Sequence, residues 1–171
     1  LDNPNNTDQV PLLDENNGVY TISSIQEVGE LLEKLKAGKL LKGLIWRPNL
    51  QKSEADIEIE GTARAFFSLS KGIIEIKPKG MVWVLNLHRG TPIDVALAGL
   101  AKTIRLENPK FEYRNIQVPE QATESDISAI LTNETYEIER QTSAKEKGSV
   151  EIKYEDGKRY VKQVVEISNQ Q

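Results

Sequence analysis

Few residues in this sequence have the types and spacing that chemistry requires, and the first pair to consider is Tyr154 and Lys158. They are four residues apart, the spacing at which a reductase holds a phenol and an ammonium on one helical face, so that the positive charge lowers the pKa of the phenol for proton transfer. Asp156 and Gly157 lie between them, and this dipeptide is typical of a two-residue turn and unfavourable inside a helix. We therefore interpret the spacing as a coincidence at a turn edge and assign no catalytic residue.

Glycines that could bind a nucleotide phosphate are the second feature to test. A pyrophosphate site needs G-x-G-x-x-G after a strand, so that backbone N–H groups can approach the phosphates at a helix N-terminus. The sequence does not contain this pattern. Gly38 and Gly43 are five residues apart, but Leu44 follows where a P-loop has lysine. We expect a helix-to-strand turn there, no cofactor and no cofactor-binding residue.

His88 is the single histidine of the chain. It follows an apolar run that predicts a strand, and α/β folds bind ligands at the C-terminal ends of strands. The chain offers no second histidine and no cysteine for a metal site. Arg89 and the N-terminus of the helix predicted after Thr91 would favour a bound anion. The negative charge of Asp94 would disfavour it. We interpret His88 as a loop or cap residue, and keep as an alternative a small-molecule or nucleotide site at the strand ends, residues 86–91.

Two further groups of residues have a structural explanation. Asp56, Glu58 and Glu60 alternate with apolar residues, and without a glycine-spaced calcium loop they indicate a solvated stripe, so we assign no metal ligand. The aromatic residues of the apolar stretches are expected in the core: Trp46, Phe66, Phe67 and Trp83.

Composition narrows the class of protein. The 171 residues suit one domain or one domain with a tail, and the formal charge of −4 opposes a nucleic-acid partner. The absence of cysteine excludes disulfides and thiolate sites. The sequence has no apolar run of the length that a membrane span requires, and its first residues are polar. We expect a cytoplasmic protein with no membrane partner.

The stretch 81–119 predicts a strand, a helix and a second strand. Six of its first seven residues are apolar or aromatic, Thr91 and Pro92 are typical of a helix start, and Pro109 must follow the helix end. Strands joined in this way lie parallel, with a right-handed crossover.

The same patterns predict the remaining elements. Helices are expected to start near Ser24, Glu54, Pro92 and Thr123, with the second running to about Ile76. Strands are expected at 20–22 and near Leu44, Met81, Phe111 and Thr135, followed by a hairpin of 150–155 and 158–167 around Asp156-Gly157.

The stretch 81–119 also carries a family resemblance. A strand with tryptophan near its start precedes a helix reading A-x-x-GL-x-K-x-x-R-x-E-x-P, and the pattern resembles the structural subdomain of modular polyketide synthase ketoreductases, which are short-chain dehydrogenase-like. The matching residues are Trp83, Ala96, Gly99, Leu100, Lys102, Arg105, Glu107 and Pro109. The segment GLIW at 43–46 and EIKYEDGKRYVKQVV at 151–165 extend the likeness. The family continues from there into a glycine-rich loop, which this sequence does not contain.

The resemblance implies an α/β fold: a truncated Rossmann-like, mainly parallel sheet flanked by helices, with a C-terminal β-hairpin. It implies a linker or edge segment at 1–19, the subdomain at 20–167 and a tail at 168–171. The chain would be no enzyme by itself; it would brace a neighbouring catalytic domain of the synthase, either a ketoreductase half or, as a pseudo-ketoreductase, a C-methyltransferase. The acyl carrier protein would be an indirect partner. We expect the contact at Tyr160, Val161, Val164 and Val165; a free-standing interaction module remains a third hypothesis.

Overall fold

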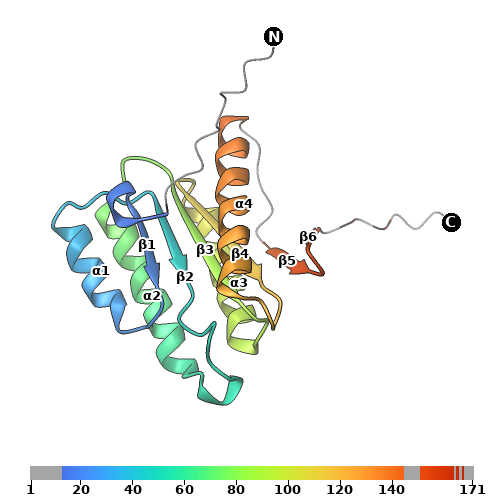
Figure 1. Ribbon diagram of the computed structural model, residues 1–171. Helices are drawn as coiled ribbons and strands as arrows, with labels where there is room; N and C mark the ends of the chain where they lie inside the picture. The colour runs from blue at the N-terminus through green and yellow to red at the C-terminus, as the bar shows by residue number, and fades with distance from the viewer. Residues whose placement is uncertain (1–12, 145–150, 164, 166, 168–171) are drawn as a thin grey trace, which may run out of the picture.

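The computed structural model describes residues 13–144, 151–163, 165 and 167, which form the expected α/β fold around one six-stranded sheet (Figure 1). The strands lie side by side in chain order: β1 Val19–Ile22, β2 Gly43–Trp46, β3 Val82–His88, β4 Phe111–Gln117, β5 Glu151–Glu155 and β6 Lys158–Val161. β1 to β5 are parallel, and β6 returns antiparallel to β5. The predicted mainly parallel sheet with a C-terminal hairpin is therefore confirmed.

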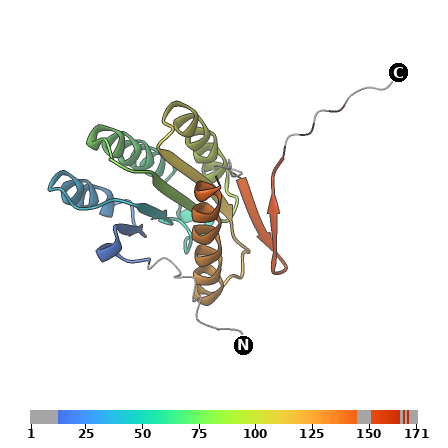
Figure 2. The same ribbon diagram turned by 90° about the horizontal axis from the view of Figure 1, so that it is seen from above.

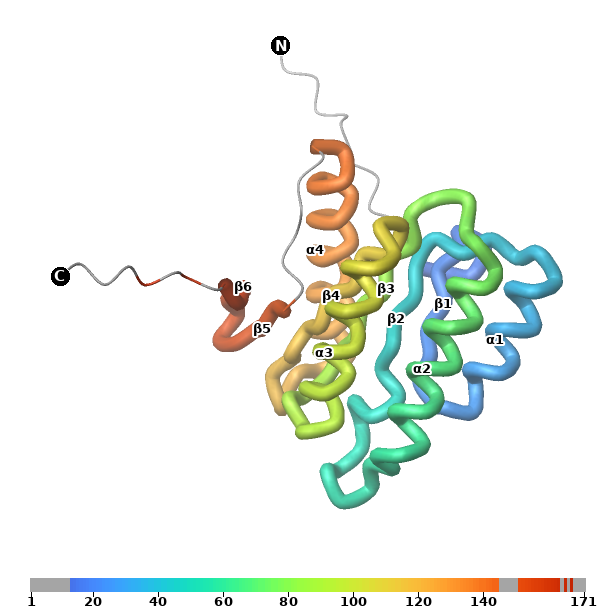
Figure 3. Tube along the Cα trace, turned by 180° about the vertical axis from the view of Figure 1, so that it is seen from behind, coloured from blue at the N-terminus to red at the C-terminus, as the bar shows by residue number. Residues whose placement is uncertain are grey.

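Four helices cover the sheet unequally (Figures 2 and 3). α1 Glu27–Lys36, α2 Ile59–Ile76 and α3 Pro92–Glu107 pack on one face, and α4 Glu124–Ser143 packs on the other. Short 3-10 turns at Glu15–Asn17 and Glu54–Asp56 precede β1 and α2. None of the helices described is both long and apolar enough to cross a membrane.

Successive side chains of a strand point to opposite faces of the sheet. Each central strand therefore contributes side chains to two hydrophobic cores, one on each face. On β3, Val84 joins the core under α1 to α3, whereas Leu85 joins the core under α4. All seven residues of β3 are buried, which explains why its sequence is a nearly continuous apolar run rather than an alternating one.

The connection that contains α4 differs from the first three connections in its handedness. The strands advance in one direction from β1 to β5, and three of the connecting helices lie on one face while α4 lies on the opposite face. The β4–α4–β5 crossover is therefore of opposite hand to the preceding units. Crossovers between parallel strands are right-handed in the great majority of cases, so specific contacts must hold β5 and β6 in place.

The predicted helix starts are confirmed where a capping side chain is present. Thr91 and Asp94 form a reciprocal capping box at the start of α3, and Thr123 and Asp126 do so at α4. The hairpin turn at Asp156 and Gly157 also has the expected left-handed backbone, with φ of 50° and 70°.

Three local predictions are wrong. The strand expected near Thr135 is part of α4, because Thr123 caps a helix whose apolar stripe continues to Ile138. The helix expected from Glu54 begins at Ile59, because Glu54–Asp56 form a separate 3-10 turn and the backbone of Ile57 and Glu58 is extended. Phe67 is 58% exposed rather than in the core, because its neighbour Phe66 faces the sheet.

Gly43 provides a test of the packing between β2 and β3. A Cβ atom there would lie 2.2 Å from the Trp83 indole carbons Cε2 and Cζ2. We expect Gly43→Ala to destabilise the fold by about 1–3 kcal/mol, the usual cost of overpacking a core. Chemical denaturation followed by circular dichroism measures this change.

Gly99 of α3 is the matched control, because its Cβ would meet no atom within 4 Å. Gly99→Ala should stabilise the protein by about 0.5–1 kcal/mol, the difference between glycine and alanine inside a helix. Equal effects of the two substitutions would contradict this account of Gly43.

Candidate functional site

The last two strands are anchored to α4 by a buried carboxylate, Glu134, whose side chain is 0% exposed. Arg114 of β4 donates to its Oε2 at 3.0 Å. Arg159 of β6 donates to both oxygens, at 2.6 and 3.1 Å. The Tyr154 hydroxyl of β5 donates to Oε1 at 2.6 Å. One carboxylate of α4 thus holds three strands in register.

Charge at this cluster is fixed by its hydrogen bonds. Burial alone would raise the pKa of Glu134, but the bonds from Arg159, Tyr154 and Arg114 outweigh it and hold the pKa below its ordinary value. Burial and the bond to Glu134 raise the pKa of Tyr154 to about 12. A reductase would need that phenol pKa lowered, and Tyr154 and Lys158 lie on a hairpin rather than a helix. The prediction that their spacing is a coincidence is supported by both observations.

The face of the hairpin turned away from α4 has no helix over it (Figure 2). One residue of the expected contact points to this face: Tyr160, which is 48% exposed. Val161 pairs with Ile152 and therefore points to the α4 side, where it is 36% exposed. Val165 is also exposed, and Val164 lies outside the described residues. Tyr160 and Val161 border a hollow of about 400 Å³ between the hairpin and α3.

The same hollow reaches the strand ends named in the alternative hypothesis. His88 and Asn115 line it, and the Nδ2 atom of Asn115 is buried without a hydrogen-bond partner among the described residues. Burial lowers the pKa of His88, against the smaller influence of Asp94 and Glu151. Its Nδ1 accepts the backbone N–H of Gly90 at 3.0 Å. His88 is thus the last residue of β3 and accepts a backbone hydrogen bond from the loop that follows.

Other groups at 86–91 are engaged inside the fold. Arg89 donates to the backbone carbonyls of Leu50 at 2.8 Å and of Pro119 at 2.7 Å, so it joins the loops after β2 and β4. The hydroxyl of Thr91 bonds to Asp94 at 2.7 Å. The predicted opposition of Asp94 to an anion site is consistent with its place in this helix cap.

The acidic residues of the described part of the chain do not form a metal site. Asp56, Glu58 and Glu60 are all exposed, as predicted for a solvated stripe. Among the described residues no group of three or more histidine, aspartate or glutamate side chains is placed to hold a metal ion.

Sequence reasoning missed the cluster around Glu134. Two signals in the sequence point to it: Arg114 lies between Tyr113 and Ile116 in a predicted buried strand, and Glu134 falls on the same helical stripe as Ile127, Ile130 and Ile138. A charged residue on each of two buried faces indicates that the two are paired.

The fold alone defines the class as an α/β protein with a mainly parallel sheet. A match to a family model defines the class further. The model described as beta-ketoacyl synthase-like, N-terminal matches residues 14–135, most of the chain. The chain therefore belongs to this family, which places it among the polyketide and fatty acid synthase-type proteins. Neither the curated proteins nor the solved structures contain a match to this chain.

Removal of the Glu134 charge tests the anchor. We expect Glu134→Gln to destabilise the protein by about 3 kcal/mol, the lower end of the cost of losing one partner of a buried pair, because the amide oxygen still accepts one bond. The control is Glu137→Gln on the same helix, which breaks a surface pair with Arg140 and should cost below about 1 kcal/mol. Urea denaturation of both variants gives the comparison.

Acid should abolish the same contribution. Because the folded-state pKa of Glu134 is depressed, its stabilisation is complete above the ordinary value of 4.5 and is lost as the pH falls through the folded-state pKa. The difference in unfolding free energy between the native chain and Glu134→Gln should hold from pH 7 to 5 and shrink below pH 4.5. A difference that already shrinks between pH 7 and 5 would contradict a depressed pKa.

Proposed function

We propose that this chain is a non-catalytic structural subdomain of a polyketide synthase, which braces a neighbouring catalytic domain through its C-terminal hairpin. Family membership supports a synthase context. The ketoreductase assignment is finer than that family model and rests on the motif at Trp83 and on residues 96–109.

The observation that carries the proposal is the arrangement of β5 and β6. Glu134 fixes the hairpin from the α4 side, and Lys102 of α3 reaches Glu151 of β5 at 2.5 Å. The hairpin is thus held from both sides, while Tyr160 on its uncovered face, Val161 at the end of β6 and the nearby Val95 remain exposed. Exposed apolar side chains on a strand pair held in this way are suited to contact an adjoining domain.

The adjoining domain would be a ketoreductase catalytic half or a C-methyltransferase, and its position relative to the acyl carrier protein would depend on this contact. Bracing requires no reacting group in this chain. That requirement agrees with the internal roles of His88, Arg89 and Tyr154 described above.

Mixing this chain with a candidate catalytic ketoreductase half tests the proposal. NADPH-dependent reduction should increase on mixing, and the double variant Tyr160→Asp, Val161→Asp should weaken complex formation at least tenfold in titration calorimetry, because charges replace apolar contact area. The control pair Leu106→Asp, Tyr136→Asp alters two exposed apolar residues away from the hairpin and should leave binding within twofold.

A second candidate, a small-molecule or nucleotide site, is favoured by one observation: the unpartnered Nδ2 of Asn115 in the hollow beside His88. Titration of the isolated chain with NADPH separates the two. Saturable binding that Asn115→Leu removes would support the small-molecule site and contradict the brace; no binding alone, with reduction on mixing, would support the brace.

A further inference from the structure

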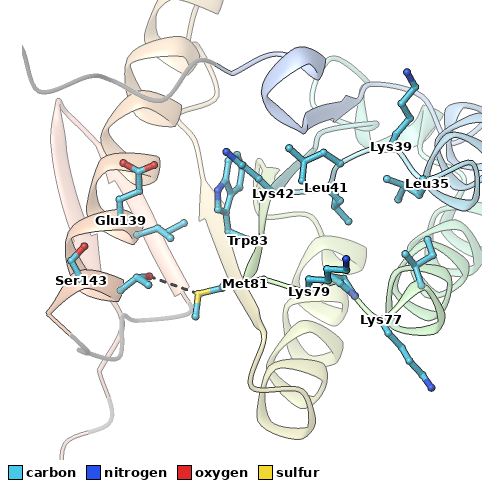
Figure 4. Close-up of a pocket in the computed structure, with 17 residues that line it drawn as sticks. Leu35, Lys39, Leu41, Lys42, Lys77, Lys79, Met81, Trp83, Glu139 and Ser143 are labelled. Atoms are coloured by element: carbon cyan, nitrogen blue, oxygen red, sulfur yellow. Dashed lines mark hydrogen bonds between the residues drawn. The ribbon is translucent and has the colours of Figure 1, made fainter.

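A second cavity lies at the opposite edge of the sheet from the hollow beside His88. It measures about 850 Å³ and is bordered by the segments leading into β2 and β3 and by the C-terminal ends of α1, α2 and α4 (Figure 4). A volume of this size falls within the range of about 300–1,000 Å³ that small-molecule sites occupy.

The floor of this cavity is apolar. Trp83 and Leu41 line it, together with Met81, which is 44% exposed. The indole of Trp83 lies directly on Gly43, where any Cβ would collide with it. On the α4 side, the Thr142 hydroxyl contacts the Met81 sulfur at 3.7 Å, and this contact is drawn in Figure 4.

Among the described residues, four lysines and the carboxylate of Glu139 line this cavity. The lysines are Lys39, Lys42, Lys77 and Lys79, and none of them forms an ion pair within the described part of the chain. Elsewhere most cations are paired, for example Lys34 with Glu15 and Lys102 with Glu151. The protein carries a net charge of −4, so this positive edge runs against its overall balance.

Helix ends explain part of the pattern. Lys39 and Lys77 follow the C-termini of α1 and α2, where the helix dipole favours cations. Lys42 and Lys79 instead belong to the segments leading into β2 and β3, and the backbone N–H of Trp83 donates to the carbonyl of Lys42 at 3.1 Å. Figure 4 shows both lysines around the cavity with Trp83. Helix dipoles do not explain these two lysines.

We propose that this cavity binds an amphiphilic anion, a molecule with an apolar chain and a phosphate or carboxylate group. The apolar chain of the ligand lies against Trp83, Met81 and Leu41. Its anionic group is held by Lys42 and Lys79. Ammonium groups recognise phosphate and carboxylate as point charges without fixed geometry, which suits exposed and flexible lysines. This site is independent of the hairpin face and of the proposed bracing role.

Titration with dodecyl phosphate below its critical micelle concentration tests the site. We expect saturable binding by calorimetry and a change in tryptophan fluorescence, because Trp83 borders the cavity. The double variant Lys42→Glu, Lys79→Glu should bind at least tenfold more weakly. The matched control Lys52→Glu, Lys158→Glu makes the same charge change at exposed positions outside the cavity and should bind within twofold of the native chain.

Any of three results with small ligands would overturn the proposal. They are equal loss of binding in the two double variants, equal binding of uncharged dodecanol, and equal binding of inorganic phosphate, which has no chain. Circular dichroism first establishes that each variant is folded. Sedimentation with vesicles of phosphatidylcholine, with and without phosphatidylglycerol, separates the two sources of the ligand. Binding to anionic vesicles together with dodecyl phosphate binding indicates a membrane lipid. Dodecyl phosphate binding without vesicle binding indicates a free amphiphilic anion. Vesicle binding without dodecyl phosphate binding would also overturn the site.

Discussion

The carboxylate of Glu134 is the interaction on which the placement of the last two strands depends. A buried carboxylate costs several kcal/mol, of order 5, unless its oxygens are paired, and here donors arrive from β4, β5 and β6 at once. A shift of the hairpin by one residue would turn Tyr154 and Arg159 away from α4, because side chains alternate between faces. Burial of one charge thus specifies the register of a strand pair that topology alone would not place, since its crossover has the uncommon hand.

The position of α4 also explains the exposed face of the hairpin. Three helices lie side by side on one face and end with α3, and the fourth helix crosses to the other face. No helix therefore follows α3 over β5 and β6, and the side chains there meet solvent instead of a neighbour. The exposure of Tyr160 is a direct consequence of the topology. The same crossover that requires the Glu134 anchor creates the surface to which we assign a partner.

Sequence patterns predicted the fold wherever a local rule governed it. Thr91 with Asp94 and Thr123 with Asp126 cap helices through contacts within four residues, and Asp156-Gly157 sets the hairpin turn. The strand expected near Thr135 failed because its alternation competed with a helical stripe that began at Ile127 and was already capped. The Glu134 cluster could not be predicted in this way, since its members come from four elements and their meeting depends on the hand of the last crossover. The hollow beside His88 follows from that crossover too, and lay beyond sequence reasoning for the same reason.

The two edges of the sheet differ in how their charged groups are used. At the C-terminal edge, where α/β proteins usually bind ligands, Arg89 and Thr91 are engaged in hydrogen bonds that hold loops and a helix cap together. At the other edge, Lys42 and Lys79 make no ion pair among the described residues, beside an apolar floor. Side chains that a fold needs for its own stability are paired internally, and those it leaves unpaired are available to a ligand. This contrast is the reason that we propose recognition at the hairpin and at the lysine-lined cavity rather than at the conventional ligand edge of the sheet.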